Sequence, residues 1–444
     1  MPRALLVAYY MPPAGGPAVQ RILQFVEHLR DEGWALEVLT VREGAYPNRD
    51  PALCDAVPPG VWVHRTRALD PYAVYQALTG KGEEDLPTGS MAPEEPSWTE
   101  HLARWVRANV FLPDARVGWV PFAVWRGKQL LDTGRFDALI TSGAPHSVHL
   151  SGWALQWGTG TPWVADLHDP WTDISYYEDL PHTRWARRLD AALERGVLAR
   201  ADAVTTVSPS WADLFSRKAP NDYHVVENGF DTADVAGLRE EPAADAFVLA
   251  HVGKLYASRN PTALWDALAS LRAEGAIPNL RLRLVGTVDP AVEQSLATRN
   301  LGPIVERVGF VPHDEALRHM ARSTLLLLVI EEFAQADGMI TSKLYEYLAS
   351  GRPVLGVGPP AGDANALLRR HDAGEIIGRS DTSRLRAVVQ AQYEAWEEGR
   401  PVEGASLDAL AEHTRRHQAH RMARVLDDIT GRSTADTASP HALD

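Results

Sequence analysis

The chain of 444 residues is long enough for about two domains, because a single hydrophobic core stops growing near ~250–300 residues. Its 45% hydrophobic and 23% charged residues are typical of a globular protein, and its one cysteine excludes internal disulfides and cysteine-rich metal sites. The formal net charge of −14 argues against nucleic acid as a partner, since phosphate backbones attract basic surfaces.

The first predicted strand begins almost at the N-terminus, so we expect no secretory signal. The longest aliphatic run, at 325–330, is far shorter than the ~20 residues of a membrane-spanning helix. We therefore expect a cytoplasmic protein.

The first half of the chain is predicted to alternate strands and helices. It begins with a strand over 4–9 (ALLVAY), followed by a helix with apolar residues at helical spacing over 19–29. Between them lies PPAGGP, with Gly15 and Gly16 at a strand-to-helix turn, where open α/β sheets bind ligands. Further strands are predicted at 35–41, 137–141, 162–167 and 203–208.

A second series of strands and helices is predicted in the other half. Its strands are expected at 247–253, 280–286, 304–311, 325–330 and 352–358, with a helix over 261–273. Apart from the strand at 325–330, each of these strands ends near a glycine, as turns with ligand access often do.

We therefore predict an α/β protein with two Rossmann-like domains that face each other across a cleft. The predicted parts are an N-terminal domain at 1–230 with a mobile loop at 70–98, a linker at 231–245, a C-terminal domain at 246–403, a helical segment at 404–430 and a disordered tail at 431–444.

The strongest chemical signal is the stretch DGMITSKLYEYLASGRPVLG at 337–356. Thr341 or Ser342 is predicted to cap a helix over 343–349, which Gly351 ends. The free amides at the start of such a helix favour an anion.

Two charged residues of this helix fit a phosphorylated ligand. Lys343 lies in the first turn, where a cation is unfavourable unless a phosphate lies beside it. Glu346 follows on roughly the same face, where its carboxylate can accept hydrogen bonds from sugar or ribose hydroxyls.

Seven motifs occur in an order that resembles one known family. They are YYMPPAGGPAVQR, LHDPW, VSPS, ENGFD, GKLYASRNP, VGFVPHDEAL and SKLYEYLASGRPVLG, and together they span roughly residues 8–358. The sequence resembles the retaining nucleotide-sugar glycosyltransferases of family 4, which have the GT-B fold. The stretches LPDARVGW and PWVADLHDPW resemble a bacterial branch found in surface-polysaccharide pathways.

The resemblance implies roles for individual residues. It assigns catalytic contacts to His168, Arg259 and Lys343, and donor-binding contacts to Gly15, Gly16, Lys254, Val311, Gly338, Ile340 and Glu346. In this scheme Arg259 and Lys343 bind the diphosphate, while Glu346 lies near the ribose. His168 would touch the donor sugar, with Asp169 on the acceptor side to orient its ring or to cap the turn before Pro170.

One position departs from the family pattern. Many members carry two glutamates separated by seven residues, and Glu346 matches the second, but Gly338 occupies the place of the first. We expect backbone amides around Gly338, Met339 and Ile340 to make the contact that the missing glutamate makes elsewhere.

No metal and no cofactor are expected. The sequence contains no Asp-x-Asp pair, no His-Glu-x-x-His and no Gly-x-x-x-x-Gly-Lys-Ser/Thr loop. The charge of a leaving group would then be neutralised by Lys343, Arg259 and helix N-termini.

A basic, aromatic stretch at 101–128 stands out in an acidic chain. Together with Glu100, this stretch carries a net charge of +3. It can dock at an anionic membrane surface, or it can form a core helix and a loop beside an acceptor site.

The predicted function is transfer of a sugar from a nucleotide-sugar donor to an acceptor hydroxyl, with retention of configuration. The acceptor is expected to be a glycan, a lipid-linked intermediate or a small molecule. Two alternatives remain open: a nucleotide-sugar 2-epimerase of the same fold, and a non-catalytic protein that binds sugar nucleotides or glycans.

Overall fold

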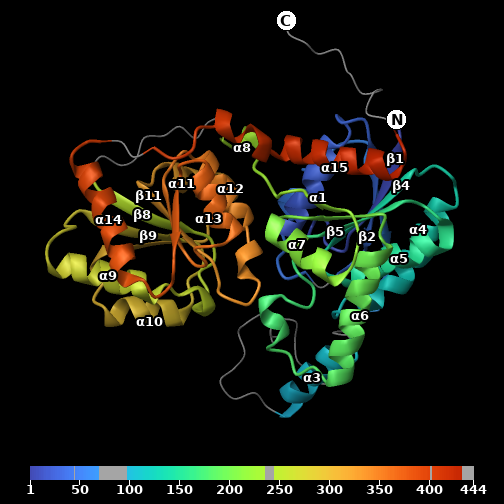
Figure 1. Ribbon diagram of the computed structural model, residues 1–444, viewed down its shortest axis with the longest axis horizontal. Coiled ribbons are helices and arrows are strands. Elements are labelled where there is room, and N and C mark those ends of the chain that lie inside the picture. The colour runs from blue at the N-terminus through green and yellow to red at the C-terminus, as the bar shows by residue number, and fades with distance from the viewer. Residues whose placement is uncertain (45, 70–97, 236–244, 401–402, 433–444) are drawn as a thin grey trace, which may run out of the picture. The chain divides into compact units, whose positions relative to one another are not determined.

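The computed structural model describes residues 1–44, 46–69, 98–235, 245–400 and 403–432 (Figure 1). These residues form two compact units: unit 1 comprises 1–227 and 418–444, and unit 2 comprises 228–417. Most of the predicted mobile loop, linker and tail lies outside the described residues.

Unit 1 is built on a parallel sheet of seven strands in the order β3-β2-β1-β4-β5-β6-β7. The strands are β1 (Arg3–Val7), β2 (Ala35–Val41), β3 (Trp62–Thr66), β4 (Ala138–Gly143), β5 (Trp163–Leu167), β6 (Ala203–Thr206) and β7 (Tyr223–Val225). The central strands β1, β4 and β5 are almost entirely buried, as expected for a parallel sheet covered on both faces.

The helices of unit 1 connect these strands. They are α1 (Pro17–His28), α3 (Trp98–Asn109), α4 (Val120–Leu131), α5 (Ser147–Thr159), α6 (Arg184–Arg200), α7 (Pro209–Lys218) and the greater part of α15 (Arg415–Ile429). Helix α1 begins at Pro17, a residue suited to the first helical position, directly after Gly16 with its φ of 108°. Apolar residues of α1 and α15 pack in one core cluster with strands β1, β2 and β4.

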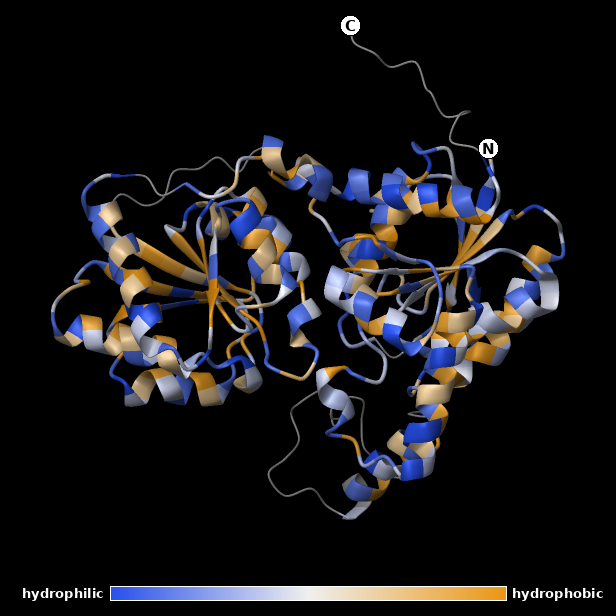
Figure 2. Ribbon diagram, viewed as in Figure 1, coloured by the Kyte–Doolittle hydropathy of each residue, from blue (hydrophilic) through white to orange (hydrophobic). Residues whose placement is uncertain are grey.

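Unit 2 repeats this architecture with six parallel strands in the order β10-β9-β8-β11-β12-β13. The strands are β8 (Phe247–Val252), β9 (Leu280–Val285), β10 (Val305–Gly309), β11 (Leu325–Val329), β12 (Val354–Val357) and β13 (Gly374–Ile377). Its helices are α8 (Thr232–Val235), α9 (Thr262–Ala273), α10 (Pro290–Thr298), α11 (His313–Ala321), α12 (Ser342–Ala349), α13 (Asp363–Arg370) and α14 (Thr382–Glu397). Figure 2 shows hydrophobic strands at the centre of the unit and helices with hydrophilic outer faces.

The prediction of a two-domain α/β fold is confirmed, and each strand predicted from an apolar run is present. Three strands were not predicted: β3, β7 and β13. All three are edge strands with partly exposed residues, so they lack the continuous apolar run of a buried strand. None of the described helices is long and apolar enough to cross a membrane.

The C-terminal helical segment is divided between the two units. The predicted helical segment at 404–430 contains α15, and from Gln418 onward this helix belongs to unit 1. Nε1 of Trp34 donates a hydrogen bond of 3.0 Å to Asp427, and Met422 and Leu426 are buried in the core of unit 1.

Candidate functional site

In unit 2 a lysine lies directly against the carboxyl end of a central strand. Gly253 follows β8 with a φ of 120°, a conformation that side chains rarely adopt. A Cβ atom added to Gly253 would lie 2.8 Å from Cε of Lys343 and still closer to its Nζ. A glycine is therefore required here for the ammonium group to approach the backbone.

Lys343 lies in the first turn of α12, as predicted. Burial, and then the positive charge of Arg259, lower the pKa of Lys343 to about 8, while Glu346 acts in the opposite direction. The surroundings of the ammonium group therefore disfavour its positive charge. A bound anion would relieve this, so the position suits an anion-binding site.

Arg259 provides a second cation at this edge. It lies in a short 3-10 helix, Ala257–Arg259, with its guanidinium 5.9 Å from the ring centre of Tyr256. Its Nε is buried without a hydrogen-bond partner among the described residues, and the nearest acidic atom in an ion pair is Oε2 of Glu331 at 3.9 Å. The guanidinium therefore keeps hydrogen-bonding capacity for a ligand.

Glu346 lies further along α12, in an environment of mixed charge. Burial raises the pKa of its carboxyl group, while His313, Arg415 and Lys343 oppose this shift. Nε2 of His313 lies 3.3 Å from Asp234, which raises the pKa of His313. The surrounding cations favour the acceptor form of Glu346, which suits a hydroxyl ligand.

The loop before α12 has the predicted cap position but uses part of its backbone within the protein. Thr341 occupies the N-cap position, but neither it nor Ser342 makes a side-chain capping bond, and the Thr341 hydroxyl is buried without a partner in the described structure. The amides of Gly338 and Met339 donate to Gln335 and Ala336 within a 3-10 turn. Of the three amides expected to replace the missing glutamate, only that of Ile340 remains.

The other predicted donor residues of unit 2 have different environments. Lys254 is exposed, whereas the side chain of Ile340 is buried in the core. Val311 is partly buried against the same core, and its neighbour Phe310 is 88% exposed.

In unit 1 the glycine pair occupies the turn before α1, as predicted. The amide of Gly15 donates to the carbonyl of Asn48 at 3.0 Å, so it is already used within the protein. A side chain at Gly15 would also crowd Asp50, whose Cβ lies 3.0 Å from the ideal Cβ position. Gly16 remains the candidate of this pair for an approach to a ligand.

His168 follows β5 at the carboxyl end of the sheet of unit 1. Its Nε2 lies 3.0 Å from Oδ2 of Asp166 and 2.8 Å from Oγ of Ser142. Asp169 was expected to orient this ring or to cap the turn before Pro170; the carboxylate within hydrogen-bond distance of Nε2 is that of Asp166. Burial raises the pKa of Asp169, against the effect of His168.

Asp166 is fully buried and multiply bonded. Arg21 donates to both of its oxygens, at 3.0 and 2.7 Å, and Thr205 donates to Oδ1 at 2.7 Å. Burial opposes the charge of Asp166, but the guanidinium of Arg21, followed by His168, holds its pKa well below the usual range. The carboxylate is therefore ionised and acts only as an acceptor.

Several of these residues were not singled out from the sequence. Gly253 directly precedes the predicted Lys254, and a glycine at the end of a strand is a signal that could have identified it. Asp166 lies two residues before His168, which places both on one face of an extended strand. Arg21 carries no such signal, because a lone arginine on a helix usually faces solvent.

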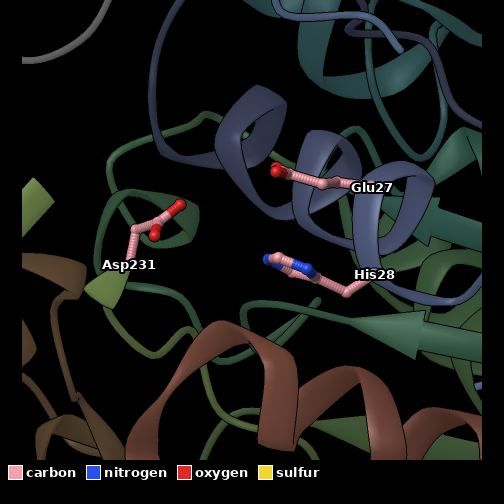
Figure 3. A group of neighbouring side chains, drawn as sticks. All are labelled: Glu27, His28 and Asp231. Carbon is pink, nitrogen blue, oxygen red and sulfur yellow. The ribbon is translucent and has the colours of Figure 1, made fainter. Parts of the chain in front are cut away.

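Acidic and histidine side chains are the groups of this protein that could hold a metal ion. Figure 3 shows Glu27 and His28, neighbours at the end of α1, together with Asp231 of unit 2. Within the described ranges, neither unit by itself offers three such side chains close enough to share one ion.

Comparison with known protein families divides the chain in the same way as the fold does. A family model described as "Glycosyl transferase 4-like domain" matches residues 15–229, and one described as "Glycosyl transferases group 1" matches residues 246–393. Together they cover most of the chain. Among curated protein sequences, none matches significantly.

Solved structures resemble the whole chain at low sequence identity. HepE of Anabaena, solved in complex with UDP and glucose, is 16% identical with a TM-score of 0.60, over 96% of this chain and 99% of that one. Sucrose-phosphate synthase of Thermosynechococcus elongatus is 17% identical with a TM-score of 0.59, over 97% and 96%. A glycosyltransferase of Rickettsia africae is 10% identical with a TM-score of 0.62, over 97% and 100%.

Proposed function

The chain belongs to the glycosyltransferases with the GT-B fold, and on that premise we propose that it transfers a sugar from a nucleotide-sugar donor to an acceptor hydroxyl with retention of configuration. The observation that carries this proposal is the position of Lys343 against Gly253, with Arg259 contributing a second positive charge. Two cations with one carboxylate at 3.9 Å form a place for a diphosphate. The similar HepE structure contains UDP, which supports the same class of donor here.

Each residue of the proposed donor site then has a chemical role. Lys343 and Arg259 neutralise the charge that develops on the departing nucleoside diphosphate. Glu346 accepts hydrogen bonds from ribose hydroxyls, and Val311, beside the exposed ring of Phe310, lies toward the base. In this scheme no metal is needed, since the protein supplies both cations.

On the acceptor side, we assign His168 to the hydroxyls of the reacting sugar. Retention would follow a same-face route in which the departing phosphate helps to deprotonate the acceptor.

We further propose that the acceptor is carried on a lipid, as an intermediate of polysaccharide or glycoconjugate synthesis. Helix α3 supports this, because Trp98, Leu102 and Trp105 follow one face of the helix and are 75%, 52% and 45% exposed. Arg104 and Arg107 lie on the same helix. Exposed tryptophan together with arginine suits the headgroup region of an anionic bilayer.

This membrane contact can be tested with vesicles of phosphatidylcholine, alone or mixed with phosphatidylglycerol. We expect sedimentation with the anionic vesicles, reduced at least fivefold by Trp98→Ala with Trp105→Ala. Trp157→Ala is the matched control, because Trp157 is 84% exposed on a different helix, α5. Equal binding by the double variant would remove α3 from the proposal.

The function itself is tested by a calorimetric screen of UDP-, GDP-, TDP- and CDP-sugars in the presence of a chelator. We expect one nucleotide class to bind the wild type and to bind Lys343→Ala at least tenfold more weakly. Binding that requires a divalent ion would refute the metal-free part of the proposal. Failure of every nucleotide sugar to bind would refute the donor site.

Product analysis then separates transfer from the alternatives. Conversion of the donor sugar without any acceptor would identify an epimerase, and binding without turnover would identify a non-catalytic protein. Transfer with the donor's anomeric configuration preserved in the product is the expected outcome.

A further inference from the structure

The hydrogen bonds around His168 fix the direction of its proton. The hydroxyl of Ser142 donates to Oδ2 of Asp166 at 2.8 Å, so the single proton of that hydroxyl is already used. Asp166 is ionised and can only accept. Nε2 of His168, within 2.8 Å of Ser142 and 3.0 Å of Asp166, must therefore be the donor to both oxygens.

We propose that Asp166 and Ser142 are positioning residues that hold His168 as the tautomer protonated at Nε2, so that its Nδ1 presents a lone pair to the sugar site. This inference rests on the proposed function only for the identity of the group that Nδ1 meets. A nitrogen with a lone pair accepts a hydrogen bond from a sugar hydroxyl, whereas a protonated Nδ1 would instead have to donate one.

The sheet itself builds this arrangement. Ser142, Asp166 and Thr205 are paired directly in the register of β4, β5 and β6, so they form one row of polar side chains across the sheet. All three are at most 1% exposed. The row lies on the face that α1 covers, where Arg21 reaches Asp166 from the helix.

Arg21 fixes the carboxylate in turn. Besides its two bonds to Asp166, its guanidinium donates to the carbonyl groups of Glu227 and Val226 at 2.9 and 2.8 Å. The Asp166 carboxylate therefore cannot rotate without breaking its hydrogen bonds to Arg21. The Arg21 guanidinium is itself fixed by its bonds to the two backbone carbonyl groups. The imidazole side chain is only 10% exposed, which leaves it little freedom to turn away.

The tautomer can be read directly by nitrogen NMR on protein labelled with ¹⁵N-histidine. Protonated and unprotonated ring nitrogens differ strongly in chemical shift, and loss of one signal pair in His168→Gln assigns the ring. We expect the wild type to be protonated at Nε2 and unprotonated at Nδ1. A ring protonated at Nδ1, or an even mixture of tautomers, would overturn the proposal.

A double variant tests whether Asp166 is the cause. Arg21→Met with Asp166→Asn removes both charges and so avoids an unpaired buried ion. We expect its His168 signals to shift toward a mixture of tautomers, with kcat at least tenfold lower and the donor Kd changed less than threefold. Retention of the pure Nε2 tautomer in this variant would overturn the role of Asp166.

The matched control is Thr205→Val. Thr205 donates to Oδ1 of Asp166, the oxygen that does not contact His168, and it is equally buried. Valine has nearly the same volume as threonine, so the substitution removes only this hydrogen bond. We expect its His168 tautomer to match the wild type, and a shift equal to that of the double variant would overturn the proposal. The tautomer is read without turnover, so failure of every donor to react would count against the proposed function alone.

Discussion

The charged side chains at the carboxyl edges of the two sheets differ in how well the protein pairs them. In unit 1 the Asp166 carboxylate is completely buried, yet Arg21, Ser142 and Thr205 satisfy it with short hydrogen bonds. In unit 2, burial and the nearby positive charge of Arg259 lower the pKa of Lys343, and the carboxylate that pairs with Arg259 is 3.9 Å away. A charge that the fold satisfies stabilises the protein, while a charge left unsatisfied is available to a ligand. Four predictions test this contrast.

The largest effect is expected in unit 1, from Arg21→Ala. This change leaves the buried Asp166 carboxylate without its main cationic partner, which costs about 3–5 kcal/mol for an ion pair of this kind. Calorimetric unfolding should show a lower transition temperature for unit 1. A loss below about 1 kcal/mol would mean that the pair does not stabilise the fold.

Lys343→Met should have the reverse signature. Because burial and Arg259 disfavour the ammonium group, its removal should stabilise the fold by about 1–2 kcal/mol while weakening donor binding about 100-fold. Thermal unfolding and calorimetric binding measure the two effects. Lys128→Met is the control, since Lys128 is exposed and paired with Asp132. This substitution should change neither the free energy of unfolding nor donor binding by much.

Gly253→Ala should damage the same site without altering any charge. Its Cβ would collide with Lys343 and force the ammonium group away, so we expect about tenfold weaker donor binding. Gly275→Ala provides the control, because Gly275 also has a positive φ of 71° but nothing within 4 Å of the added Cβ. Both should cost about 1 kcal/mol through backbone strain, and only the first should weaken binding.

The smallest effect is a dependence of donor binding on pH. With a pKa of about 8, Lys343 is mostly protonated at pH 7 and mostly neutral at pH 9. Binding of a diphosphate needs the charged form, so the donor Kd should rise about tenfold between these values. Lys343→Arg keeps its charge throughout, and its Kd should stay flat. A wild-type Kd that is independent of pH would place Lys343 away from the ligand.

The fold was largely predictable because buried parallel strands have continuous apolar sequences. The short edge strands were not, since β7 has only partly buried residues and β3 has only one buried residue, so neither shows an apolar run or a clear alternation. The place of α15 could not be predicted either, because an amphipathic helix does not reveal which sheet it covers. In the structure, Met422 and Leu426 are buried in the core of unit 1.

At the candidate site, the sequence identified the residues that carry a recognisable pattern. Lys343 was predicted from its unusual place in the first turn of α12, and the structure places it there. The partners that define its surroundings depend on tertiary structure: Gly253 is 90 residues away, and Glu331 pairs with Arg259 across the strand ends. Asp166 was overlooked for Asp169 because the spacing along a strand, rather than adjacency, decides which side chain meets the ring.

The path of the chain has a consequence for how the protein is made. The core of unit 1 includes Ala419, Met422 and Leu426 of α15, yet unit 2 lies between them and the rest of unit 1 in the sequence. During synthesis the first 227 residues therefore leave the ribosome before α15 does. The part of their core beside α1 stays incomplete until the whole of unit 2 has been translated. Unit 2 is one continuous stretch, so its core needs no segment from later in the chain.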